Sequence, residues 1–179
     1  MLFLGTGFNL HMKVLIIGPS GSGKTFVAKS LQRAGINAFD ADDIEGLSNW
    51  YDQNGKKVEV PTTADQAINN HYAFLWSRKF LADFLAAFGD VYLFGGSGNV
   101  SGMFNLFDKV YCLKIDPELQ KERLRSPLRS MPLMDANDDG PVIWGAWFEK
   151  MAKEKNIPFI DASKTPEQIF QIISRHDTH

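Results

Sequence analysis

The chain has 179 residues, of which 44% are hydrophobic and 22% are charged. This ordinary globular composition excludes a disordered, collagen-like or coiled-coil chain. The 19 Lys and Arg residues against 21 Asp and Glu residues give a net charge of -2, which gives no support to a protein that coats nucleic acid. The single cysteine, Cys112, excludes an internal disulfide framework and an all-cysteine zinc site.

No apolar run reaches about 18 residues, so the sequence predicts no membrane span and a single cytoplasmic domain. Residues 1–11 carry neither a basic segment nor a cleavage signal and are not typical of a secretory leader. Because Met12 and Lys13 open directly onto an apolar run, we interpret residues 1–11 as an N-terminal extension added by a mis-assigned start. A short extra strand or an arm is the alternative.

A strand, a glycine-rich loop and a helix follow one another from residue 14 onwards. Val14–Ile17 is a short apolar run, and residues 26–34 have helical spacing of apolar residues before Gly35 ends the helix. The loop between them matches the phosphate-binding pattern G-x-x-x-x-G-K-[ST] with Gly18, Pro19, Ser20, Gly21, Ser22, Gly23, Lys24 and Thr25. Its glycines let successive N–H groups face one phosphate. Lys24 is suited to reach the β- and γ-phosphates of ATP, and the Thr25 hydroxyl to ligate Mg²⁺.

Three aspartates follow the second predicted strand, residues 36–39: Asp40, Asp42 and Asp43. Carboxylates at this strand end are suited to hold the hydration shell of Mg²⁺ or to accept the proton of a substrate hydroxyl. The alternative is structural, with Asp42 or Asp43 as the cap of a helix that begins at Ile44.

The middle of the chain predicts a hairpin, a helix and a third strand. Asn54-Gly55 separates two strand-like runs within residues 47–60, which is a strong hairpin signal. Residues 64–88 carry apolar and aromatic residues at helical spacing, and Val91–Phe94 is the third strand. The loop that follows, Gly95-Gly96-Ser97-Gly98, lets a ligand approach the backbone closely; a tight turn is the alternative.

The last part of the chain predicts strands at 110–115 and 157–160 and helices at 117–125, 142–155 and 166–174. Asp116 with Pro117, and Thr165 with Pro166, are typical helix starts. Residues 126–140 are rich in Pro and Asp, which is typical of a mobile loop.

Three arginines lie within seven residues where the predicted helix runs into this loop: Arg123, Arg125 and Arg129. Cations there are typical of a lid that closes over ATP and stabilises the charge of phosphoryl transfer; a solvated helix face is the alternative. Trp144, Trp147 and Phe148 have helical spacing, which favours core packing over base stacking.

Strands alternate with helices throughout, which predicts an α/β fold with helices on both faces of a sheet. Ligands of such sheets bind at the carboxyl ends of the strands. The glycine-rich loop, the aspartates, the Gly95–Gly98 loop and the segment Asp161-Ala162-Ser163 all fall there.

These residues resemble the small P-loop kinases of the shikimate, gluconate and adenylate kinase group. The resemblance covers most of residues 12–174 and rests on Gly18–Thr25, Asp40-x-Asp42, Gly95-Gly96 and the run from Asp116-Pro117 to Glu122-Arg123-Leu124. It implies a three-layer P-loop NTPase fold with a five-stranded parallel sheet of order 2-3-1-4-5. It also implies one domain over residues 12–179, with an acceptor-binding insert at about 44–88 and a lid at about 123–140.

The resemblance assigns roles to single residues. Asp40 would help Thr25 hold Mg²⁺, Asp42 would meet the acceptor hydroxyl, and Gly95 and Gly96 would lie against the acceptor. Arg123 or Arg125 would contact ATP. The backbone that would border the adenine is that of Asp161, Ala162 and Ser163.

Two departures from the kinase pattern bear on the acceptor. The third strand ends in Phe94-Gly95 without an Asp at the usual second metal position, and Arg78 is the only arginine between Asp43 and Gly95 that is available to an acidic acceptor. The aromatic residues Trp50, Tyr51 and Trp76 occupy this region instead. The pattern disfavours shikimate and favours a less acidic acceptor, or a nucleoside or nucleotide stacked on an aromatic ring.

We therefore expect an ATP- and Mg²⁺-dependent kinase, a monomer or homodimer, that phosphorylates a small-molecule hydroxyl or a nucleoside or nucleotide. The alternative is a non-catalytic ATP-dependent sensor or adaptor, which the missing acid on the third strand favours. A nucleic-acid end kinase is the third reading, and the balanced charge disfavours it.

Overall fold

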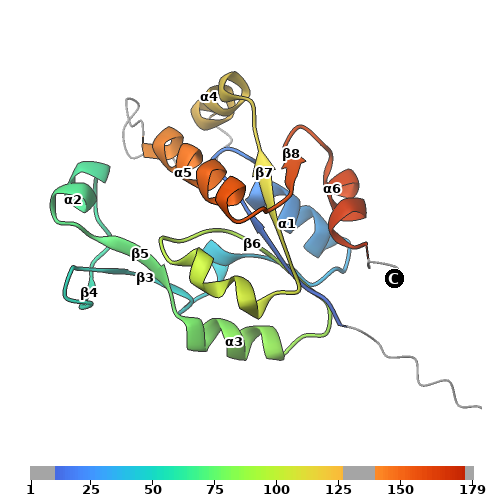
Figure 1. Cartoon of the computed structure of the whole chain (residues 1–179), viewed down its shortest axis with the longest axis horizontal. Coiled ribbons are helices and arrows are strands. Elements are labelled where there is room, and N and C mark those ends of the chain that lie inside the picture. Colours follow the sequence, from blue (N-terminus) through green and yellow to red (C-terminus); the bar gives the residue numbers. More distant parts are fainter. Residues whose placement is uncertain (1–10, 127–139, 176–179) are drawn as a thin grey trace, which may run out of the picture.

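The computed structural model describes residues 11–126 and 140–175 and is built around a five-stranded parallel sheet (Figure 1). The strands stand in the order β2 (Ala38–Asp40), β6 (Val91–Phe94), β1 (Lys13–Ile17), β7 (Lys109–Lys114) and β8 (Phe159–Asp161). These are the five strands that the sequence predicts, so the order 2-3-1-4-5 is confirmed. The central strand β1 is buried on both faces from residue 14 to residue 17, which explains its continuous apolar run.

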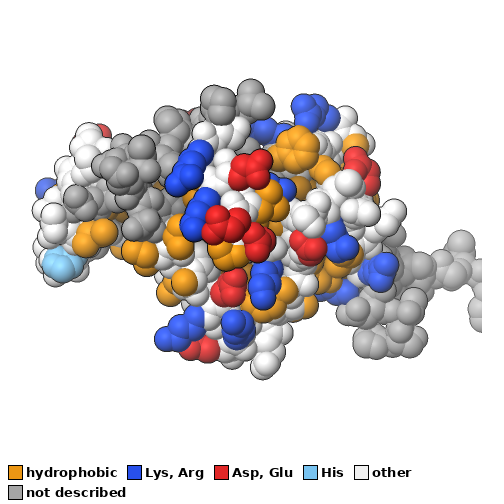
Figure 2. Space-filling model, turned by 90° about the horizontal axis from the view of Figure 1, so that it is seen from above, with side chains coloured by type: hydrophobic (Ala, Val, Ile, Leu, Met, Phe, Trp, Pro, Cys, Tyr) orange, Lys and Arg blue, Asp and Glu red, His pale blue; other side chains and the backbone are white. Residues whose placement is uncertain are grey.

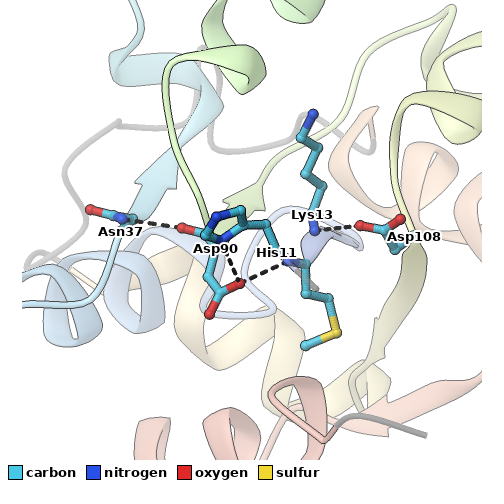
Figure 3. Close-up of polar contacts among 6 residues, drawn as sticks. His11, Lys13, Asn37, Asp90 and Asp108 are labelled. Carbon is cyan, nitrogen blue, oxygen red and sulfur yellow. Dashed lines mark hydrogen bonds and ion pairs between the residues drawn. The ribbon is translucent and has the colours of Figure 1, made fainter. Parts of the chain in front are cut away.

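Two carboxylates fix the start of β1 (Figure 3). Asp90, just before β6, accepts a hydrogen bond from the Met12 N–H at 2.8 Å, and its carbonyl accepts one from the Asn37 side chain at 3.1 Å. Asp108, just before β7, accepts one from the Lys13 N–H at 2.7 Å. The three adjacent strands β6, β1 and β7 are therefore aligned at their amino ends. Residues 1–10 of the predicted extension lie outside the described residues.

Alternate residues of β1 enter two hydrophobic cores, one on each face of the sheet. Leu15 and Ile17 pack with residues of α3, α5 and the 3-10 helix η2, and Val14 and Ile16 pack with residues of α1 and α6. These helices are α1 (Lys24–Arg33), α3 (Arg78–Ala86), η2 (Val100–Leu106), α5 (Gly140–Glu154) and α6 (Pro166–Ile173). The result is the predicted three-layer architecture (Figure 1).

A second, antiparallel sheet of order β4-β3-β5 lies beside the main sheet (Figure 1). Its strands are β3 (Ser48–Tyr51), β4 (Lys57–Val58) and β5 (Ala73–Trp76). The predicted Asn54-Gly55 hairpin is confirmed as the β3-β4 turn, in which the Gly55 N–H donates to the Asp52 carbonyl at 3.0 Å.

The single helix predicted over residues 64–88 is wrong. The chain forms α2 (Ala64–Asn69), then β5, then α3. Asn70 is the C-cap of α2, and His71 with a φ of 52° turns the chain away from the helical path. Phe74 and its neighbours pair across the sheet with β3, so here tertiary pairing overrides the helical spacing.

A helix cap also determines the conformation of the segment after β2. Asp40 accepts the Asp42 N–H at 3.0 Å and caps the short 3-10 helix η1 (Ala41–Asp43). The alternative of an Asp42 or Asp43 cap on a helix from Ile44 is therefore wrong, because the chain turns into β3 there. Helix α4 (Pro117–Arg125) begins after the predicted Asp116 cap, and α6 after the predicted Thr165 cap.

The predicted mobile loop and lid fall largely on residues 127–139, including Arg129, which lie outside the described residues. Within residues 11–126 and 140–175, no helix combines the length and the apolar character needed to cross a membrane.

Candidate functional site

The phosphate-binding loop connects β1 to α1 through a left-handed glycine. Gly23 is the N-cap of α1 with a φ of 92°, a conformation that a residue with a Cβ adopts only with strain. Helix α1 therefore begins at Lys24, and the N–H groups at the amino end of a helix are suited to bind an anion. The Lys24 ammonium donates hydrogen bonds to the carbonyls of Gly18 at 2.7 Å and Pro19 at 3.0 Å. The loop thus holds a cation over its own first residues.

Helix α4 supports the loop with two side chains. Gln120 is buried, and its Nε2 donates to the Ser20 carbonyl at 3.0 Å. The Arg123 guanidinium donates to the carbonyls of Gly21 and Ser22, each at 3.4 Å, and to that of Ala162 at 3.2 Å. Arg123 therefore joins the phosphate-binding loop to the segment after β8.

The other residues predicted to face the nucleotide separate into two places. Asp161 accepts a hydrogen bond from the Ser163 N–H at 2.8 Å, and this bond is the main cause that lowers the pKa of Asp161. The segment lies beside the loop because Arg123 binds the Ala162 carbonyl. Arg125 is exposed and lines a separate surface hollow with Glu118 and Lys121.

The aspartates after β2 divide between the site and the surface. Asp40 is buried, with 7% of its surface exposed. Much of the surface of Asp42 is exposed to solvent. Its carboxyl group is nevertheless partly desolvated by the surrounding protein, and this desolvation is the main cause that raises the pKa of Asp42. The charges of Asp40 and Asp43 also raise the pKa, whereas the charge of Lys24 lowers it. Asp43 forms an exposed ion pair with Lys29 at 3.2 Å.

A cavity of about 1300 Å³ extends from the phosphate-binding loop to the second sheet. Lys24 and Asp42 line it together with Gly18 and Ser20. The remainder is lined by residues of β3, β4 and β5 and the loops beside them, by Gln66 of α2, by Gly96 and Ser97 after β6, and by Trp144 and Phe148 of α5. Two predicted groups, the phosphate-binding lysine and the candidate proton acceptor, therefore share one space.

Close packing explains why the two residues that follow β6 are glycines. A Cβ at Gly95 would overlap Ala41, and one at Gly96 would overlap the Phe148 ring of α5. Gly96 also lines the cavity, so it combines close packing with access for a ligand. Arg78 lies outside the cavity lining and donates to the Gly102 carbonyl at 2.6 Å and to the Asn105 side chain at 3.0 Å.

Sequence reasoning missed four residues that shape the site. Gln120 supports the loop, Asn99 binds the backbone of β5, and Trp144 and Phe148 line the cavity from α5. The spacing of Trp144 and Phe148 predicts core packing, which is confirmed for the buried Phe148 and wrong for Trp144, of which 44% is exposed. No local pattern points to Gln120 or Asn99, because their partners are distant in sequence.

No protein-family model matches the chain, and no curated protein matches its sequence. Solved structures do match it. A shikimate kinase from Aquifex aeolicus aligns with a TM-score of 0.50 and 18% identity over 91% of this chain and 94% of that chain. A gluconokinase from Sinorhizobium meliloti 1021 aligns with a TM-score of 0.50 and 14% identity over 90% of this chain and 89% of that chain.

A deoxyadenosine kinase from M. mycoides, solved with bound dATP, aligns with a TM-score of 0.52 and 14% identity over 91% of this chain and 97% of that chain. The alignments span nearly the whole of both partners in each case. The chain therefore has the P-loop fold of the small kinases, as its loop, sheet order and helix layers already indicate. At identities this low the alignments establish only the fold, and the reaction has to be inferred from the residues of the site.

Proposed function

We propose that the chain is an ATP- and Mg²⁺-dependent kinase that transfers the γ-phosphoryl group of ATP to a hydroxyl of a small molecule or nucleoside. One observation carries the proposal: a single cavity is lined by Lys24, by Asp42 and, further along, by the aromatic side chains of the second sheet. A phosphate-binding cation, a proton acceptor and a chamber for an acceptor are thus contiguous. The names of the solved structures with this fold support the same class of reaction.

Each group has a role in this reaction. Lys24 and the N–H groups of the loop bind the phosphates. Asp42 accepts the proton of the acceptor hydroxyl as that oxygen forms its bond to phosphorus and the bond to the leaving ADP oxygen breaks. A raised pKa makes the ionised Asp42 a stronger base than an ordinary aspartate. When bound, ATP with Mg²⁺ supplies the phosphoryl group and neutralises part of its charge.

The residues present fit Mg²⁺. The Thr25 hydroxyl and the buried Asp40 carboxylate are hard oxygen donors of the kind that Mg²⁺ prefers. No three His, Cys, Asp or Glu residues of the described part of the chain form a metal-binding group. This agrees with Mg²⁺, which proteins usually hold through one or two side chains together with substrate phosphates and water.

One observation favours a second candidate, a non-catalytic ATP-binding sensor or adaptor. Strand β6 ends in Phe94 and passes directly into Gly95, so it provides no carboxylate for the metal at this edge of the sheet. A nucleic-acid end kinase has less support. On the face seen in Figure 2, Lys and Arg side chains stand among Asp and Glu side chains and form no continuous basic stripe.

The test measures ATP consumption with Mg²⁺ against sugars, nucleosides, nucleoside monophosphates and hydroxy acids. We expect transfer to one acceptor class, a fall of at least ~100-fold in Lys24→Ala, and wild-type rates in Lys29→Ala. Lys29 is the matched control because it lies on the same helix and pairs with Asp43 at the surface. Full activity of Lys24→Ala would contradict the proposal, and nucleotide binding without transfer to any acceptor would establish the sensor instead.

A further inference from the structure

The second sheet presents an apolar row to the cavity. Trp50 of β3 pairs across the sheet with Val58 of β4 and with Phe74 of β5, so these three side chains lie side by side on one face. The Trp50 and Phe74 rings have centroids 5.4 Å apart and are tilted by 50°. All three residues line the cavity and are only partly buried. Tyr51, the next residue of β3, is outside the lining.

Helix α5 supplies a second aromatic wall. Trp144 and Phe148 are one helical turn apart and therefore share a face of the helix, and their ring centroids are 6.3 Å apart. Both line the cavity. Phe148 is held in place against Gly96, whereas Trp144 keeps 44% of its surface exposed. Large aromatic side chains left open at a concave surface are typical of a binding site for an apolar or flat ligand.

The charges that line the cavity disfavour an acidic acceptor. They are the lysines Lys24, Lys56 and Lys57 and the acids Asp42, Asp52 and Glu59. Lys24 belongs to the phosphate-binding loop. The rest of the cavity lining therefore has two lysines and three carboxylates. None of the described residues that line the cavity is an arginine, the side chain that binds carboxylates and phosphates through two parallel hydrogen bonds.

From these three observations we infer that the acceptor is a hydroxyl compound with a flat, uncharged ring, of the nucleoside class. The ring binds between the row of the second sheet and the aromatic residues of α5, and the hydroxyl points towards Asp42. A nucleoside monophosphate or a hydroxy acid binds more weakly, because its negative charge meets three carboxylates against two lysines and no arginine. This inference rests on the proposed function and names the substrate class of the same cavity.

The experiment measures equilibrium binding by tryptophan fluorescence, with a non-hydrolysable ATP analogue filling the nucleotide site. Its ligands are adenosine, cytidine, their 5′-monophosphates, ribose and shikimate. We expect at least one nucleoside to bind about tenfold more tightly than its monophosphate or ribose, because a stacked base contributes on this scale. Trp50→Ala and Trp144→Ala should each weaken nucleoside binding about tenfold, since each removes one ring from the walls.

Tyr51→Ala is the matched control, because Tyr51 is an aromatic residue of the same strand outside the cavity lining; it should leave nucleoside affinity within about twofold of the wild type. Because 44% of the surface of Trp144 is exposed, Trp144→Ala removes less buried surface and keeps the test valid if Trp50→Ala unfolds. Thermal unfolding is followed for all variants. Binding of nucleosides without phosphoryl transfer supports the inference and contradicts the kinase. Transfer to monophosphates or hydroxy acids in preference to nucleosides supports the kinase and overturns the inference, as does equal binding of ribose and nucleosides.

Discussion

The side-chain amide of Asn99 pairs with both backbone groups of Trp76. Its Oδ1 accepts the Trp76 N–H at 3.0 Å, and its Nδ2 donates to the Trp76 carbonyl at 3.0 Å. The Ser97 hydroxyl donates to the same Oδ1 at 2.8 Å, and the Gly98 N–H donates to the Phe74 carbonyl at 2.8 Å. These bonds therefore join the loop after β6 to β5, and they fix the cavity wall that carries Phe74 to the main sheet.

Replacing Asn99 should loosen this connection. Asn99→Ala leaves the N–H and the carbonyl of the largely buried Trp76 without these partners, and we expect the free energy of unfolding to fall by about 2–4 kcal/mol. The KM of the acceptor should rise more than the KM of ATP, because the hydrogen bonds of Asn99 hold β5, which carries the cavity residue Phe74. Urea unfolding and steady-state kinetics measure the two effects.

The control for Asn99 is Gln171→Ala, which removes an exposed amide side chain from α6 and should change the free energy of unfolding by less than about 0.5 kcal/mol. If Asn99→Ala matched this control in stability and in acceptor KM, the two hydrogen bonds to Trp76 would have no part in holding the second sheet.

Sequence patterns predict those parts of the fold that neighbouring residues determine. The order strand, glycine loop, helix from Lys13 to Arg33 follows from local residue types, and so do the caps at Asp116 and Thr165. Strand β5 could not be predicted in this way, because its aromatic residues have helical spacing and become a strand only by pairing with β3. Asn99 and Gln120 act on partners 23 and 100 residues away, so no local pattern identifies them.

Gly96 should not accept a side chain. In Gly96→Ala the new methyl group would overlap the Phe148 ring, and the displacement of this ring should lower the free energy of unfolding by about 1–3 kcal/mol. Acceptor binding should weaken as well, because Phe148 lines the cavity. Thermal unfolding and acceptor titration are the measurements. Gly102→Ala is the control, since a Cβ there has no atom within 4 Å, and equal effects of the two substitutions would rule out the packing explanation.

Arg123 and Arg125 should differ although they lie on the same helix. Arg123→Ala removes the donor that joins the loop carbonyls to Ala162, so we expect ATP affinity to fall about tenfold or more. Arg125→Ala should change ATP affinity by less than about twofold, because Arg125 is exposed and lines a different hollow. Calorimetric titration with an ATP analogue compares them. A larger loss in Arg125→Ala would assign the ATP contact to Arg125 instead.

Asp42→Asn should separate activity from stability. We expect transfer to fall by about 10²- to 10⁴-fold, the usual contribution of a proton acceptor, while the fold becomes more stable at pH 7. The reason is that burial raises the pKa of Asp42 above its ordinary value of 3.8, so the folded state binds this proton more tightly than the unfolded state does. The ionised carboxylate therefore destabilises the fold at pH values above its folded pKa.

The pH dependence follows from the same shift. As the pH falls through the folded pKa of Asp42 towards 3.8, the wild type gains the proton and its stability approaches that of Asp42→Asn. Over the same range the wild type loses the ionised base, so its rate should decline at a higher pH than an ordinary aspartate would give. Asp43→Asn loses the exposed pair with Lys29 and one of the lesser charges that raise the pKa of Asp42. It should keep transfer, with a stability change below about 1 kcal/mol. Retention of transfer by Asp42→Asn, or its loss in Asp43→Asn, would reassign the proton acceptor.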